Sequence, residues 1–143
     1  MRLLSIALLL AFSAAWGAEA TEPARLKAAF VVNFAKFTRW PETAAGGEVR
    51  ICFQSVTDAV GEAMARMSNL RIRSRPVRVQ RGVNRLELQR CHVIYVGHSD
   101  EYQCRQILAR LAGSQILTVS ELPGFTADGG MIELFPEGRK YRF

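Results

Sequence analysis

The chain has 143 residues, a formal net charge of +6 and 49% hydrophobic residues. This length fits one domain with a modest core, and the sequence shows no internal repeat, low-complexity tract or linker, which argues against a repeat protein or a chain of several domains. A basic excess of this kind suits binding to nucleic acid, to an acidic protein face or to anionic lipid headgroups.

The first residues have the pattern of a secretory signal peptide. A positive start at residues 1–2 precedes an apolar run over residues 3–15 and an A-x-A cleavage motif at residues 18–20. The apolar run is shorter than the roughly 20 residues that cross a bilayer, and no cysteine follows that could be lipidated. We expect cleavage after Ala20, a mature chain over residues 21–143 and a periplasmic location. A retained N-terminal anchor is the alternative.

A helix is predicted over residues 23–38, and it is apolar on two sides. On a helical wheel the large side chains share one face and the small ones share the opposite face. We expect the large face to pack on the sheet and the small face to be covered by a neighbouring helix or by another chain. The large face consists of Leu26, Phe30, Phe34 and Phe37, and the small face of Ala28, Val31, Val32 and Ala35. The candidate interface residues are Phe30, Val31, Val32, Phe34, Ala35, Arg39 and Trp40.

The rest of the chain alternates between strand-like and helix-like patterns. Strands are predicted over residues 49–54, 76–81, 92–97 and 116–120, helices over 58–69 and 100–112, and a short helical turn over 84–89. This alternation predicts an α/β fold, a single-domain three-layer sandwich with a mostly parallel sheet and helices on both faces. Two final strands, 130–135 and 140–143, are joined by a short Pro/Gly turn and predict an antiparallel hairpin at one edge.

Three cysteines in an exported chain allow one disulfide and one free thiol. Cys104 shares a predicted helical face with three apolar residues, which is typical of a small buried core residue. Cys52 and Cys91 lie in strand-like segments, so we predict a bridge between them. Closing a loop of about 40 residues would stabilise the fold by roughly 4 kcal/mol in the chain-entropy model. No C-x-x-C motif is present, which argues against thiol–disulfide catalysis.

Arginines cluster in the middle of the chain, with one glutamate, Glu87, among them. An exported protein rarely meets nucleic acid, so we expect no nucleic-acid partner and favour an acidic protein face or anionic lipid headgroups. A charged strand edge that discourages aggregation is an equally good interpretation. The cluster consists of Arg71, Arg73, Arg75, Arg78, Arg81, Arg85 and Arg90.

The loop over residues 120–130 follows the carboxyl end of a predicted parallel strand, where open α/β sheets tend to bind ligands. Polar side chains beside an aromatic ring could orient a small molecule there. A structural loop that carries the chain to the edge hairpin is the favoured alternative. The candidate ligand residues are Ser120, Glu121, Phe125, Asp128 and Gly130.

Motifs of familiar catalytic and cofactor sites are missing from the sequence. The two histidines, His92 and His98, have no metal-ligand spacing, and no nucleophile elbow, phosphate-binding loop or dinucleotide-binding glycine motif occurs. His98 with Cys104 could form a base and nucleophile, but the helical pattern points Cys104 inward. We therefore expect no enzymatic activity, no metal and no cofactor.

Three segments together resemble the YfiR family of bacterial periplasmic proteins. They are KAAFVVNFAKFTRWP at 27–41, CHVIYVG at 91–97 and LTVSELPGFTADGGMIEL at 117–134. The resemblance runs from Lys27 to the end of the chain. It implies an α/β sandwich, dimers in some members, and a disulfide between the cysteines that match Cys52 and Cys91.

The resemblance also implies a regulatory role. A YfiR-like protein binds the periplasmic sensor domain of an inner-membrane diguanylate cyclase and holds the cyclase inactive. An outer-membrane lipoprotein of the OmpA type can sequester such a repressor, which raises cyclic-di-GMP and promotes biofilm. The expected partners are therefore a membrane diguanylate cyclase, an OmpA-like lipoprotein and a second copy of this chain. A small-molecule sensor without a cyclase partner is the alternative.

Three departures from the family pattern affect this expectation. The segment FQSVTDAVGEAM at 53–64 lacks the Gly-Asp-Asp-Pro-Phe-Gly-like run that is usual there, and only one further cysteine remains, so the second bridge of some members cannot form. The chain also stops at RKYRF, where relatives typically continue. If that stretch serves partner contacts or the core, we expect a shortened or differently deployed relative.

Overall fold

The structure, a computed structural model, describes residues 20–41 and 47–143. The predicted signal peptide lies outside the described residues except for Ala20. None of the helices in the described ranges combines the length and the apolar character that crossing a bilayer requires.

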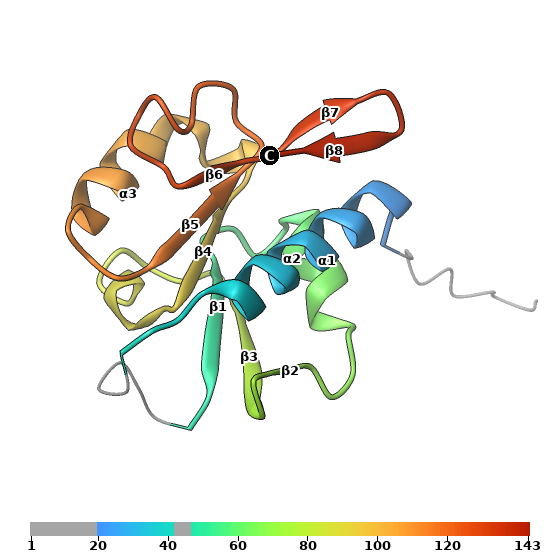
Figure 1. Cartoon of the computed structure of the whole chain (residues 1–143). Helices are drawn as coiled ribbons and strands as arrows, with labels where there is room; N and C mark the ends of the chain where they lie inside the picture. Colours follow the sequence, from blue (N-terminus) through green and yellow to red (C-terminus); the bar gives the residue numbers. More distant parts are fainter. Residues whose placement is uncertain (1–19, 42–46) are drawn as a thin grey trace, which may run out of the picture.

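Helices and strands alternate along the chain much as the sequence predicts (Figure 1). The elements are α1 (Glu22–Phe37), β1 (Val49–Phe53), α2 (Ala59–Ala65), β2 (Arg71–Ile72), β3 (Arg75–Arg81), the 3₁₀ helix η1 (Leu88–Arg90), β4 (Val93–Val96), the 3₁₀ helix η2 (His98–Gln103), α3 (Cys104–Leu111), β5 (Leu117–Ser120), β6 (Ile132–Glu133), β7 (Phe135–Glu137) and β8 (Lys140–Arg142).

The main sheet has the strand order β2-β3-β1-β4-β5-β6. The strands from β3 to β6 are parallel to their neighbours, and β2 pairs antiparallel with β3 at one edge. Among the parallel strands the first lies between the second and the third, which is a common order of doubly wound α/β folds. In such folds the connections that follow the two central strands, here β1 and β4, run to opposite faces of the sheet. A crevice therefore opens at the carboxyl ends of β1 and β4.

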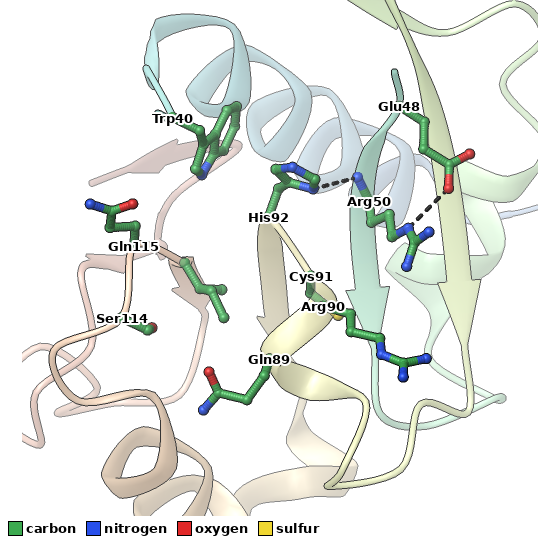
Figure 2. A pocket seen from close by; sticks show the side chains of 10 residues that line it. Trp40, Glu48, Arg50, Gln89, Arg90, Cys91, His92, Ser114 and Gln115 are labelled. Atoms are coloured by element: carbon green, nitrogen blue, oxygen red, sulfur yellow. Dashed lines mark hydrogen bonds and ion pairs between the residues drawn. The ribbon is translucent and has the colours of Figure 1, made fainter. Parts of the chain in front are cut away.

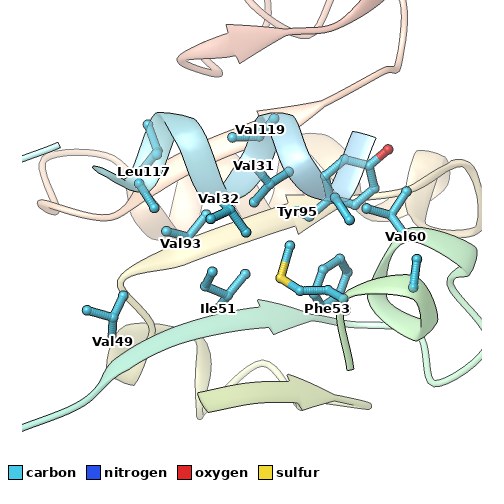
Figure 3. Close-up of a cluster of buried hydrophobic side chains, with 14 of the residues drawn as sticks. Val31, Val32, Val49, Ile51, Phe53, Val60, Val93, Tyr95, Leu117 and Val119 are labelled. Atoms are coloured by element: carbon cyan, nitrogen blue, oxygen red, sulfur yellow. The ribbon is translucent and has the colours of Figure 1, made fainter. Parts of the chain in front are cut away.

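Two apolar clusters, one on each face of the sheet, make the three predicted layers. Ile51 and Phe53 point to the face covered by α1 and α2, as Figure 3 shows. Cys52, between them in the strand, points to the opposite face, where α3 packs with Ile107. Successive side chains of a strand alternate between faces, so one short strand such as β1 contributes to both clusters. The predicted α/β sandwich with a mostly parallel sheet is confirmed.

The expected orientation of α1 is wrong. The small face packs on the sheet, with Ala28, Val31 and Ala35 fully buried, whereas Phe37 of the large face is 86% exposed. Small side chains let the helix come close to the sheet and bring more atoms into van der Waals contact. Because both faces are apolar, the helical wheel could not tell which of them the sheet covers.

The C-terminal hairpin is confirmed, but its place differs from the expectation. The predicted strand over residues 130–135 is divided into β6, which pairs parallel with β5, and β7, which pairs antiparallel with β8. Leu134 lies between them, fully buried, and its N–H donates to the carbonyl of Ser120 at 2.7 Å. The chain therefore leaves the main sheet at Leu134, and β7 and β8 form a separate two-stranded sheet.

Candidate functional site

The outer face of α1 carries an aromatic patch, which we define as Phe30, Phe34, Phe37 and Phe143. The rings of Phe30 and Phe34 stack at 6.1 Å, and Phe143 meets Phe34 edge-on with the ring centroids 4.8 Å apart. Phe143 itself remains 71% exposed. The second apolar face of α1 is thus partly covered by the last residue of the same chain, and aromatic surface remains open beside it.

The structure separates the candidate interface residues of α1 into two groups. Val31, Val32 and Ala35 lie in the core beneath the helix, where no partner can reach them. The accessible ones are Phe30, Phe34, Arg39 and Trp40, which are exposed or half-buried. Any contact through α1 therefore uses its aromatic side and the residues that follow its C-terminus.

A hollow of about 380 Å³ lies beside Trp40, at the amino-terminal ends of β1, β4 and β5 (Figure 2). Trp40 meets the ring of His92 edge-on at 5.5 Å. The Nδ1 of His92 accepts a hydrogen bond from the backbone N–H of Arg50 at 3.0 Å. Within the described part of the chain, the buried Nε1 of Trp40 and Oγ of Ser114 have no hydrogen-bond partner. The lining residues are Trp40, Glu48, Arg50, Gln89, Arg90, Cys91, His92, Ser114, Gln115 and Ile116.

Most of the candidate ligand loop serves the fold. Ser120 is fully buried, and its hydroxyl donates to the carbonyl of Val96 at 2.6 Å. Phe125 is buried in the second core cluster, and its ring lies against Gly130, where there is no room for a Cβ atom. Asp128 pairs on the surface with Arg105 at 3.3 Å. These contacts favour the alternative interpretation of a structural loop.

Glu121 is the loop residue that faces a hollow. It forms an ion pair with Lys27 of α1, and His98 Nε2 lies 3.6 Å from its Oε1. The hollow, of about 260 Å³, also includes Asp58 and lies after the carboxyl ends of β1, β4 and β5. This is the crevice that the strand order predicts. No sequence pattern predicts that Lys27 reaches Glu121, since these residues lie far apart in the chain.

Asp58, which is half-buried, and Tyr95, which is buried, lie near this crevice and have raised pKa values. Burial raises the pKa of Asp58, although hydrogen bonds from the N–H groups of Gly61 and Val60 oppose the shift. Burial also raises the pKa of Tyr95, and the negative charge of Glu121 adds to the shift. The Tyr95 hydroxyl therefore stays protonated at physiological pH, and burial disfavours the charged form of Asp58.

The contact between Gly97 and Asp58 gives a testable prediction about this end of the sheet. Asp58 caps α2 by accepting hydrogen bonds from Val60 and Gly61 at 2.9 and 3.0 Å. A Cβ atom on Gly97 would lie 2.0 Å from Asp58 Oδ2. We expect Gly97→Ala to displace the cap and lower the free energy of unfolding by about 1–2 kcal/mol in urea denaturation.

Gly47→Ala is the matched control, because nothing lies within 4 Å of a Cβ atom there. The backbone φ of Gly97 is −86°, a value that alanine adopts readily, so any loss of stability comes from the contact. Equal stability of the two variants would contradict the described position of Asp58.

The predicted disulfide between Cys52 and Cys91 is present, and it joins β1 to the segment just before β4. Cys104 is free and buried in α3, as expected. Burial raises the pKa of the Cys104 thiol, so it is a poor nucleophile.

Within residues 20–41 and 47–143, no group of three or more histidine, cysteine or acidic side chains is placed to hold a metal ion.

Several of the clustered arginines contact the backbone. Arg73 donates to the carbonyl of Lys36 at 3.2 Å, Arg75 to that of Glu48 at 2.8 Å, and Arg81 to that of Val56 at 3.0 Å. These contacts join neighbouring segments at the β2–β3 side of the sheet. The cluster is therefore partly structural.

The fold and these surfaces define a disulfide-bridged, doubly wound α/β protein with a patch of aromatic side chains on its surface. A model of the YfiR/HmsC-like family matches residues 24–143, so the chain belongs to the YfiR/HmsC-like family. This match confirms the resemblance found in the sequence, and the family is one of regulatory, non-catalytic periplasmic proteins. No match was found among curated proteins.

Proposed function

We propose that this protein is a periplasmic repressor that binds the periplasmic domain of an inner-membrane diguanylate cyclase and keeps the cyclase inactive. The family match over residues 24–143 is the observation that carries the proposal. The predicted signal peptide and the disulfide support an exported, oxidised protein. Repression lowers cyclic-di-GMP, and an OmpA-like outer-membrane lipoprotein would relieve it by sequestering the repressor.

We propose the aromatic patch as the surface that contacts the cyclase. Aromatic side chains dominate the binding energy of many interfaces because they bury a large area at a small cost in conformational entropy. Phe37 projects almost fully into solvent from the last turn of α1, and Phe143 lies on the same side of the helix. Arg39 and Trp40 follow directly and extend the surface beyond the helix.

A cell-based assay tests the proposal. The full-length protein is co-expressed in turn with the membrane diguanylate cyclases of its own organism that have a periplasmic domain, and cyclic-di-GMP is measured by mass spectrometry. We expect the wild-type protein to lower cyclic-di-GMP. Phe37→Asp should weaken repression about tenfold or more in a dose response, because a charge then replaces an aromatic contact.

Tyr102→Asp is the matched control, since Tyr102 is 97% exposed but lies on η2, away from the patch. We expect this variant to repress like the wild-type protein. An unchanged cyclic-di-GMP level with the wild-type protein would remove the repressor proposal. Equal loss of repression in both variants would remove the patch as its contact surface.

A second candidate function, a small-molecule sensor, is favoured by the hollow beside Trp40. Trp40 and Ser114 line it, and their buried Nε1 and Oγ atoms have no partners among the described residues. A ligand that displaced the side chains covering these two atoms could satisfy both. Thermal-shift measurements with a panel of periplasmic metabolites test this function. A rise in melting temperature that Ser114→Ala abolishes would support it, and no shift with any compound would count against it.

A further inference from the structure

The outer edge of β3 offers unpaired backbone groups. The N–H of Val77 donates to the carbonyl of Leu70 at 2.9 Å, on the side away from β1. Backbone groups of successive residues in a strand point to opposite sides, so those of Val79 also point outward, and those of Arg78 and Gln80 point to β1. The backbone N–H and C=O of Val79 have no backbone hydrogen-bond partner among the described residues.

A groove with both polar and apolar lining runs beside this edge. Its volume is about 440 Å³, and it lies between the end of α2, the turn that follows and the outer side of β3. Met67, Leu70, Val77 and Val79 are only partly buried although they pack against the core. The lining residues are Met64, Ala65, Met67, Asn69, Leu70, Arg71, Pro76, Val77, Arg78 and Val79.

Positive charge surrounds the groove. The side chain of Arg78 is 61% exposed, and its one ion pair with a described residue, Glu48, spans 3.9 Å. Arg71 lines the same groove, and its guanidinium group donates to a backbone carbonyl, that of Ser74; among the described residues no acidic side chain forms an ion pair with it. None of the described residues that line the groove is acidic. The edge therefore suits a negatively charged occupant, and pairing with the same edge of a second copy would bring arginines together.

We propose that the outer edge of β3 binds an extended acidic segment of a partner protein as an added β-strand. The outward N–H and C=O of Val79 would pair with the backbone of that segment, and its alternate apolar side chains would enter the groove. Its acidic side chains, on the other face, would meet Arg71 and Arg78. This inference does not depend on the proposed cyclase partner, because any protein with such a segment fits the chemistry.

The test uses the oxidised full mature chain and a blocked peptide in which glutamate and valine alternate over about seven residues, a typical strand length. We expect the glutamate peptide to bind saturably with a Kd below about 1 mM, and we expect added salt to weaken this binding. The same peptide with lysine in place of glutamate should not bind. Amide hydrogen exchange should show Val79 unprotected in the free protein. On addition of the glutamate peptide its protection should rise about tenfold or more, while that of Gln80 changes little.

Val79→Pro removes the outward donor without touching the β1 ladder, so we expect a folded protein that has lost peptide binding. Gln80→Pro removes a donor that points to β1 and should lower the melting temperature markedly. If Val79→Pro does not fold, the exchange measurement on the wild-type protein decides. The proposal would be overturned if the Val79 amide is already protected in the free protein, or if both peptides bind equally well. It would also be overturned if the glutamate peptide brings no gain in protection, or if the protein self-associates through this edge.

Discussion

Replacing Cys52 and Cys91 together by alanine is expected to lower the free energy of unfolding by about 4 kcal/mol. The bridge closes a loop between residues 39 apart in sequence. Without it the unfolded chain has more conformational entropy, which favours unfolding and lowers the stability. Small domains have total stabilities of roughly 5–15 kcal/mol, so the variant should be partly unfolded at elevated temperature. Urea denaturation measures the difference.

The reduced wild-type protein provides an internal comparison for this prediction. A reductant should shift the urea midpoint of the wild-type protein to that of the double variant and leave the double variant unchanged. Cys104→Ala should respond to reductant like the wild-type protein, because Cys104 is free and buried. A double variant within about 1 kcal/mol of the wild-type protein would show that the bridge adds little. If the prediction holds, repression should also fail under reducing conditions.

Val31→Asp is expected to cost at least about 4 kcal/mol, whereas Phe37→Asp should cost less than about 1 kcal/mol. Val31 is fully buried between α1 and the sheet, so the aspartate would be an unpaired buried charge. Phe37 is 86% exposed, and the cost of an acid there comes mainly from the C-terminal end of the helix dipole. Chemical denaturation of the two variants gives both values.

This pair of variants makes the same chemical change on opposite faces of one helix. Packing of the phenylalanine face on the sheet would reverse the order of the two losses, so the comparison tests the orientation of α1 directly. A folded Phe37→Asp protein is also what the repression assay requires. A large loss of stability for Phe37→Asp would contradict both the orientation of α1 and the use of that variant.

The order of elements, the parallel sheet and the disulfide could be predicted because each leaves a local pattern. Strand-like runs bounded by turns mark the sheet, and the cysteines pair by elimination once Cys104 is placed on a buried helical face. The sequence pattern predicts one strand over residues 130–135, where the structure has the two strands β6 and β7. Such a short strand has no periodicity of its own, and its pairing with β5 depends on the buried Leu134.

The surfaces were less predictable because they depend on contacts between distant segments. A helix that is apolar on both sides gives no sign of which side the sheet takes, and the cover supplied by Phe143 comes from the far end of the chain. The ion pair of Lys27 with Glu121 joins α1 to the loop after β5 in the same way. The free edge of β3 follows from the strand order, which the sequence pattern alone does not determine.

The most direct test of the proposed repressor is a binding measurement with purified components. The oxidised protein is titrated into the periplasmic domain of each membrane diguanylate cyclase of its own organism, using isothermal titration calorimetry. We predict saturable binding that Phe37→Asp weakens about tenfold or more and that Tyr102→Asp leaves unchanged. Absence of binding between the folded, oxidised proteins at micromolar concentrations would contradict the proposed repressor function.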